Sequence, residues 1–90
     1  MTEPTELGRR VKAAREARGW TQQMLGRLAR FPDGREGPTV ADIERGKIRE
    51  PRRARVETLA AVLAVPVEWL YGTGSASVPS GRKAKPVAAA

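Results

Sequence analysis

The segment TQQMLGRLARFPDGREGPTVADIERGK, Thr21–Lys47, decides the fold that this chain of 90 residues can adopt. A threonine that can cap a helix opens the segment, and apolar residues at helical spacing then predict a helix over Gln22–Arg30. The next eight residues, Phe31–Pro38, hold two prolines and two glycines among three charges, which predicts an irregular loop. A second short helix is expected to begin at Pro38 or Thr39 and to end at Gly46. The segment therefore reads as helix, loop, helix.

The first of these helices shows which of its faces should be buried. Met24, Leu25 and Leu28 form an apolar stripe, and Gly26 permits the close approach of a neighbouring backbone. Trp20, just before the cap, can pack over the first turn. We expect Met24 and Trp20 to belong to the core.

Helical patterns flank this segment on both sides. A helix over Thr5–Arg18 precedes it and ends at Gly19, where a left-handed cap favours a residue without a Cβ atom. An apolar helix around Val56–Leu63 follows, and a last short helix around Val67–Leu70 ends at Gly72. The charged residues expected to lie off the apolar face of the first helix are Arg9, Arg10, Lys12 and Glu16.

These patterns predict one all-α domain, a compact bundle of five helices over residues 1–72, with no strand. Residues 73–90 are rich in Gly, Ser, Pro and Ala and poor in large apolar side chains, so they cannot offset the entropy cost of folding. We expect them to form a disordered basic tail.

The composition favours a polyanionic partner and excludes several kinds of chemistry. Seventeen Lys and Arg against ten Asp and Glu give a formal net charge of +7. With neither Cys nor His in the chain, disulfides, thiolate and imidazole catalysis and Cys/His zinc sites are excluded. We expect no enzyme, no cofactor and no metal. The apolar runs are too short to span a bilayer and no signal peptide is evident, so a soluble, cytoplasmic protein is expected.

Four short motifs point to one family. They are RGWTQ at Arg18–Gln22, IERGK at Ile43–Lys47, EPRR at Glu50–Arg53 and VEWLYGT at Val67–Thr73. In this order they resemble the Cro and phage-repressor (XRE) family of helix-turn-helix transcriptional regulators, and the resemblance covers residues 7–72. It implies a lambda-repressor-like bundle that binds double-stranded DNA with its third helix in the major groove. It also implies a cytoplasmic, nucleoid-associated repressor or regulator of phage or bacterial origin.

The resemblance assigns some residues to the DNA backbone. Gln22, in the first turn of the second helix, matches a glutamine that binds a phosphate in this family. Lys47, Arg49 and Arg52 lie on the connector that follows the third helix and runs along the backbone in relatives. The alternative for these three is a solvated charged loop.

Arg15 and Glu44 are expected to have a structural role. Both fall on the inward sides of their helices, where an unpaired charge would be costly. The matching residues of the family form a partly buried ion pair beneath the DNA-binding surface. We therefore predict an Arg15–Glu44 pair, with exposure of both side chains as the alternative.

The residues expected to read bases are unusual. The family's base-contacting positions correspond here to Gly37, Pro38, Thr39 and Asp42, followed by Arg45. Thr39 could touch a thymine methyl and Asp42 could accept from a cytosine amino group, although a carboxylate near phosphates is more often repelled. The loop between the two motif helices is about four residues longer than in the family. We hypothesise that Arg35 in this loop, and Arg45, make the direct base contacts.

Other functions remain open at this stage. The same bundle could serve as an antitoxin or adaptor that binds a partner protein, a toxin or a co-regulator. A homodimer would be expected to form near Trp69–Thr73. Arg82, Lys83 and Lys85 of the tail could reach DNA or could only solubilise the chain.

Overall fold

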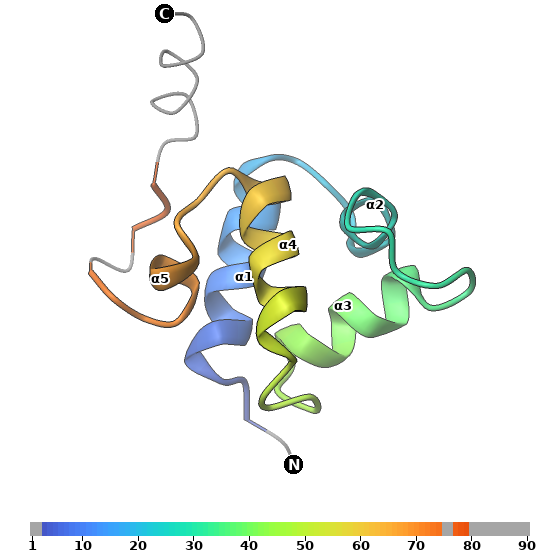
Figure 1. The fold of residues 1–90 in the computed structure, drawn as a ribbon, viewed down its shortest axis with the longest axis horizontal. Coiled ribbons are helices and arrows are strands. Elements are labelled where there is room, and N and C mark those ends of the chain that lie inside the picture. The colour runs from blue at the N-terminus through green and yellow to red at the C-terminus, as the bar shows by residue number, and fades with distance from the viewer. Residues whose placement is uncertain (1–2, 75–76, 80–90) are drawn as a thin grey trace, which may run out of the picture.

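The computed structural model describes residues 3–74 and 77–79, and within them the chain forms five helices and no strand. The helices are α1 (Glu6–Ala17), α2 (Gln22–Leu28), α3 (Glu36–Glu44), α4 (Arg53–Leu63) and α5 (Val67–Leu70). In Figure 1, α1 and α4 lie at the centre, with α5 on one side and the pair α2 and α3 on the other. The predicted all-α, five-helix architecture is confirmed.

The ends of α1 and α2 follow the local sequence signals. The hydroxyl of Thr5 accepts a hydrogen bond from the Gly8 N–H at 2.9 Å, and the hydroxyl of Thr21 accepts from the Met24 N–H at 3.0 Å. Each threonine thereby satisfies a backbone donor that the first turn of a helix leaves free. Gly19 follows α1 with a φ of 75°, the left-handed conformation predicted for it.

The loop between α2 and α3 begins and ends a few residues earlier in the chain than the sequence predicts. α3 begins at Glu36, not at Pro38 or Thr39, because the Glu36 carboxylate accepts from the Gly34 N–H at 3.0 Å and closes the loop in a turn. Pro38 is tolerated inside the helix because it falls in the first turn, where the N–H groups have no partner within the helix. α2 ends at Leu28, two residues early, and Arg30 then takes a φ of 61°.

The side chains that α2 contributes to the apolar core differ from those predicted. Met24 and Leu28, predicted to line the buried stripe, are exposed, whereas Leu25 is fully buried. Phe31, which the sequence places in the loop, is buried in the same core, and Trp20 is only partly buried against it. The buried apolar residues are Leu7, Val11, Ala14, Leu25, Ala29, Phe31, Val40, Ile43, Val56, Leu59, Ala60, Leu63, Val65, Trp69 and Leu70.

Two glycines let α3 approach its neighbours closely. A Cβ atom on Gly8 of α1 would lie 2.7 Å from the carbonyl oxygen of Glu44. A Cβ atom on Gly26 of α2 would lie 2.6 Å from the Cα atom of Glu36. Both contacts are with backbone, which cannot rotate away as a side chain can. The close approach predicted for Gly26 is therefore present, and Gly8 makes a second one.

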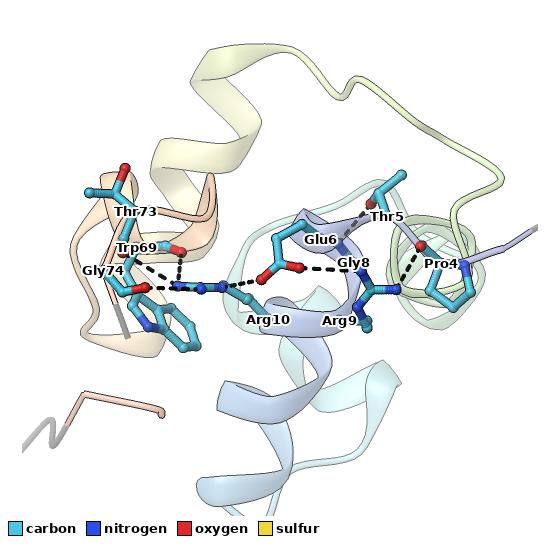
Figure 2. Close-up of polar contacts among 9 residues, drawn as sticks. All are labelled: Pro4, Thr5, Glu6, Gly8, Arg9, Arg10, Trp69, Thr73 and Gly74. Atoms are coloured by element: carbon cyan, nitrogen blue, oxygen red, sulfur yellow. Dashed lines mark hydrogen bonds and ion pairs between the residues drawn. The ribbon is translucent and has the colours of Figure 1, made fainter. Parts of the chain in front are cut away.

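Two arginines, Arg10 of α1 and Arg18 directly after it, bind the carboxyl ends of α5 and α4. Arg18 Nε donates to the carbonyl of Leu63 at 3.1 Å. Arg10 is buried, and its Nη1 donates to the carbonyls of Trp69 at 3.0 Å and Thr73 at 3.4 Å (Figure 2). The last carbonyls of a helix lack partners within the helix and attract cations, so both arginines act as distant caps.

The burial of Arg10 contradicts its predicted place on the solvent side of α1. Its Nη2 also donates to Gly74 at 3.3 Å, and its guanidinium lies 5.0 Å from the Trp69 ring centroid. Thr73 and Gly74, which the sequence assigns to the tail, are thus held to the domain, and Val78 packs partly buried against the core. Residues 75–76 and 80–90, with the basic residues of the predicted tail, lie outside the described residues.

Glu6 makes the stability of this cluster of residues depend on pH. Its carboxylate accepts from Arg10 Nε at 2.6 Å and from Arg9 Nη2 at 3.2 Å, and these two hydrogen bonds lower the pKa of Glu6 (Figure 2). A carboxyl group with a lowered pKa in the folded state stabilises the fold above its unfolded pKa. That contribution is lost as the pH falls from about 4.5 through the lowered value.

We predict that Glu6→Gln removes this part of the acid dependence. Between neutral pH and pH values below the ordinary pKa of Glu6, the thermal midpoint should fall less in Glu6→Gln than in the unsubstituted chain. Thermal unfolding followed by circular dichroism over a pH series measures the difference. Parallel pH curves for the two proteins would contradict the prediction.

None of the helices in the described part of the chain is both long enough and apolar enough to cross a membrane.

Candidate nucleic-acid interface

A shallow groove of about 740 Å³ lies where α1, the start of α2 and α3 meet. Its lining residues are Pro4, Arg9, Lys12, Arg15, Glu16, Gln22, Ala41, Glu44 and Arg45. Four of the site residues predicted from the sequence, Arg15, Gln22, Glu44 and Arg45, meet here. The groove therefore brings α1 to the same surface as the two motif helices.

The floor of the groove is an ion pair. Arg15 Nε lies 2.6 Å from Glu44 Oε2 and Arg15 Nη2 lies 3.1 Å from Glu44 Oε1, with only 11% and 4% of the two side chains exposed. Arg15 Nη1 also donates to the carbonyl of Trp20 at 2.8 Å. The hydrogen bonds with Glu44 raise the pKa of Arg15. Arg15 and Glu44 thus form the pair predicted for them, and it joins α1 to α3.

Gln22 is drawn into this network. Its Nε2 donates to Glu44 Oε1 at 3.1 Å, so the same carboxylate oxygen receives both Arg15 and Gln22. The sequence assigned Gln22 to a phosphate and did not predict this bond. Because the amide is bonded to Glu44, the side chain is held at the edge of the groove, next to the start of α2. Its contact with a phosphate stays a prediction.

The rim of the groove is basic. Arg9 and Lys12 of α1 and Arg45 at the end of α3 are exposed along it. Neither Arg9 nor Lys12 is among the site residues predicted from the sequence, which indicates only that both lie off the apolar face of α1. The signal that could have found them is their spacing from Arg15: Arg9 and Lys12 precede it by six and three residues, which puts all three along one side of the helix.

The outward face of α3 carries two arginines and one carboxylate. Arg35 Nη2 lies 3.9 Å from Asp42 Oδ2, and Arg45 Nη2 lies 3.6 Å from Asp42 Oδ1. Thr39, about one turn before Asp42, is nevertheless buried, with 5% of its surface exposed. The structure leaves Thr39 almost no surface for a base contact, and we withdraw it from the candidate contacts.

The connector residues do not gather at one place. Lys47, Arg49 and Arg52 are all exposed, and the Lys47 N–H donates to the carbonyl of Asp42 at 2.8 Å, at the end of α3. Arg49 borders a groove with Tyr71, whereas Arg52 borders another with Phe31. Only Lys47 is thus tied directly to α3.

The described residues offer no site for a metal ion of three or more His, Cys, Asp or Glu side chains. What they offer is a basic groove, an exposed helix face with two arginines, and an ion pair beneath both. Such a surface suits a rigid polyanion, because the charges are exposed and the elements that carry them are fixed to one another.

Comparison with known proteins gives one family. A model described as a helix-turn-helix domain matches residues 6–70, from the first residue of α1 to the last of α5. Neither the curated proteins nor the solved structures gave a match.

Proposed function

The chain belongs to the helix-turn-helix domain family, and we propose that it is a transcriptional regulator that recognises a specific double-stranded DNA sequence. Its finer affiliation would be with the Cro and phage-repressor (XRE) regulators, with α3 in the major groove. The observation that carries the proposal is the outward face of α3, where Arg35 and Arg45 are exposed next to a basic groove.

The proposed binding divides into positioning and reading. The phosphates on either side of the DNA major groove that receives α3 would be contacted by Arg9 and Lys12 on α1, Gln22 at the start of α2 and Lys47 after α3. Arg35 and Arg45 would contact base edges, since a guanidinium can donate two parallel hydrogen bonds to a guanine. The rigid Arg15–Glu44 pair beneath would keep the two sets in register.

A partner protein is the second candidate, and one observation favours it. Met24 and Leu28 lie four residues apart on α2 and both are exposed. An exposed apolar pair of this kind suits a partner such as a toxin or a co-regulator. Replacing both by serine should leave DNA binding unchanged if they serve a partner, and it should abolish capture of that partner.

The proposal predicts how binding responds to salt. On DNA from upstream of the chain's own gene, mobility-shift titrations should give an affinity that falls linearly with salt on logarithmic axes. Lys47→Ala should weaken binding and reduce the slope by about one unit, since it removes one phosphate contact.

Arg53→Ala is the matched control. It removes the same charge from an exposed arginine of α4, which pairs with Glu57 and lies over the ring of Tyr71. We expect Arg53→Ala to leave the slope close to that of the unsubstituted chain. Equal slopes for all three proteins would remove Lys47 from the interface, and no binding to double-stranded DNA at any salt would overturn the proposed function.

A further inference from the structure

The three polar residues on the outward face of α3 form one cluster. Arg35 directly precedes the helix, Asp42 lies near its end and Arg45 directly follows it. Seven residues separate Arg35 from Asp42 and three separate Asp42 from Arg45, so all three lie along one side of a helix with 3.6 residues per turn. The carboxylate is therefore flanked by a guanidinium on each side.

Asp42 is the fixed member of this cluster. Its side chain is 16% exposed, whereas those of Arg35 and Arg45 are 57% and 63% exposed. Its carbonyl accepts from the N–H groups of Lys47 at 2.8 Å and Ile48 at 3.1 Å, which ties its backbone to the turn after α3. A partly buried carboxylate with a fixed backbone can orient two long exposed side chains that would otherwise sample many rotamers.

The geometry divides the carboxylate between the two arginines. Oδ2 faces Arg35 and Oδ1 faces Arg45, each from one guanidinium nitrogen at under 4 Å. A guanidinium has five N–H donors, so one side can face Asp42 while the other stays available to a ligand. In the major groove, guanine is the base whose two acceptors, O6 and N7, match such a free side.

We propose that Asp42 is a positioning residue that holds Arg35 and Arg45 as a pair of guanine readers. The inference rests on the proposed function, in which α3 enters the major groove. Because both guanidinium groups meet one carboxylate and base pairs stack about 3.4 Å apart, the preferred DNA carries two guanines on neighbouring or next-neighbouring base pairs. Asp42 itself contacts no base.

Selection of bound sequences from random double-stranded DNA, with the full chain, tests this assignment. The unsubstituted chain should enrich two guanine positions. Arg35→Ala should lose one of them and Arg45→Ala the other. Asp42→Asn should weaken the preference at both positions by about ten-fold or more, which is the scale of one bidentate base contact. Asp42→Glu, which restores the carboxylate, should recover part of the preference.

Overall affinity provides a second readout, which a purely structural role of Asp42 would not move in this direction. Asp42→Asn should bind unselected DNA more tightly at low salt, because one negative charge close to the phosphates is gone. Glu57→Gln, on α4, makes the same change in net charge at an exposed residue that pairs only with Arg53 among the contacts described, and it should keep both guanine positions. Thermal unfolding checks that all variants are folded.

The outcomes separate this inference from the function on which it rests. Two guanine positions that persist in Asp42→Asn, or the loss of a single cytosine position, would overturn the positioning role. DNA that binds with a defined preference but without paired guanines would overturn the guanine assignment and leave the proposed function standing. Failure to bind double-stranded DNA under any condition would overturn both.

Discussion

Glu44→Ala should lower the free energy of unfolding by about 3 kcal/mol, because removal of one partner leaves the other as an uncompensated buried charge. Arg15 would lose both of its bonds to Glu44 and keep only the Trp20 carbonyl and a 3.8 Å approach to Glu16. Gln22 would lose its acceptor as well. Urea denaturation measures the loss.

Two further variants show that the loss comes from the unpaired charge. Glu57→Ala breaks the exposed pair with Arg53 on α4, whose atoms lie 3.0 Å apart, and should cost under about 1 kcal/mol. Replacing Arg15 by Met and Glu44 by Leu together should recover much of the stability lost in Glu44→Ala, since no buried charge then remains. A loss in Glu44→Ala no greater than that in Glu57→Ala would contradict the prediction.

The local signals in the sequence account for most of the fold. Thr5 and Thr21 cap helices by bonding their own first turns, and Gly19 ends α1 by its own backbone conformation. Each of these devices acts within a few residues, so sequence reasoning can find it. The Arg15–Glu44 pair was predicted differently, from the rule that a charge on an inward face needs a partner and from the resemblance to a family whose matching residues pair.

The predictions from the sequence are wrong where contacts between distant parts of the chain determine which side chains are buried. Arg10 is buried because its guanidinium meets the carbonyls of Trp69, Thr73 and Gly74, about sixty residues further on. Nothing near Arg10 in the sequence signals those acceptors. On α2, seven residues are too few for periodicity to choose between neighbouring faces, and the contact of Gly26 with α3 turns Met24 outward.

The arrangement of residues in the candidate site was likewise not predictable from local sequence signals. The sequence points to Arg35 and Arg45 as base contacts and, independently, to Asp42, with Arg35 placed in a loop and no contact expected among the three. Their convergence depends on the start of α3 at Glu36, which sets Arg35 two turns from Asp42 on one side of the helix. The bond that closes the loop, between Glu36 and the Gly34 N–H, is what made that start hard to predict.

At the contact of α2 with α3, we predict that alanine substitutions of two glycines, Gly26 and Gly37, change the free energy of unfolding in opposite directions. Gly26→Ala should lower the free energy of unfolding by about 3 kcal/mol, at the upper end for overpacking. Its Cβ atom would meet the backbone of Glu36, 2.6 Å from the Cα atom, and neither helix has a side chain there that could rotate away. The helices would have to separate along the whole of their contact.

Gly37→Ala, one residue further along α3, is the control across the same interface. Its Cβ atom would lie 3.7 Å from the Cα and Cβ atoms of Gln23, an ordinary contact, and its φ is not in the left-handed region. Alanine in a helix is favoured over glycine by about 0.5–1 kcal/mol, so Gly37→Ala should be neutral or stabilising by up to this amount.

Thermal and urea unfolding of both variants measure the two changes in the free energy of unfolding. A destabilisation of similar size in both would mean that α2 and α3 tolerate no added methyl anywhere on this contact, and the special role of Gly26 would be lost. If Gly26→Ala destabilises the fold and Gly37→Ala does not, the close packing of α2 against α3 is limited by the backbone of Glu36. Since α3 begins at Glu36, the same residue also sets the position of Arg35.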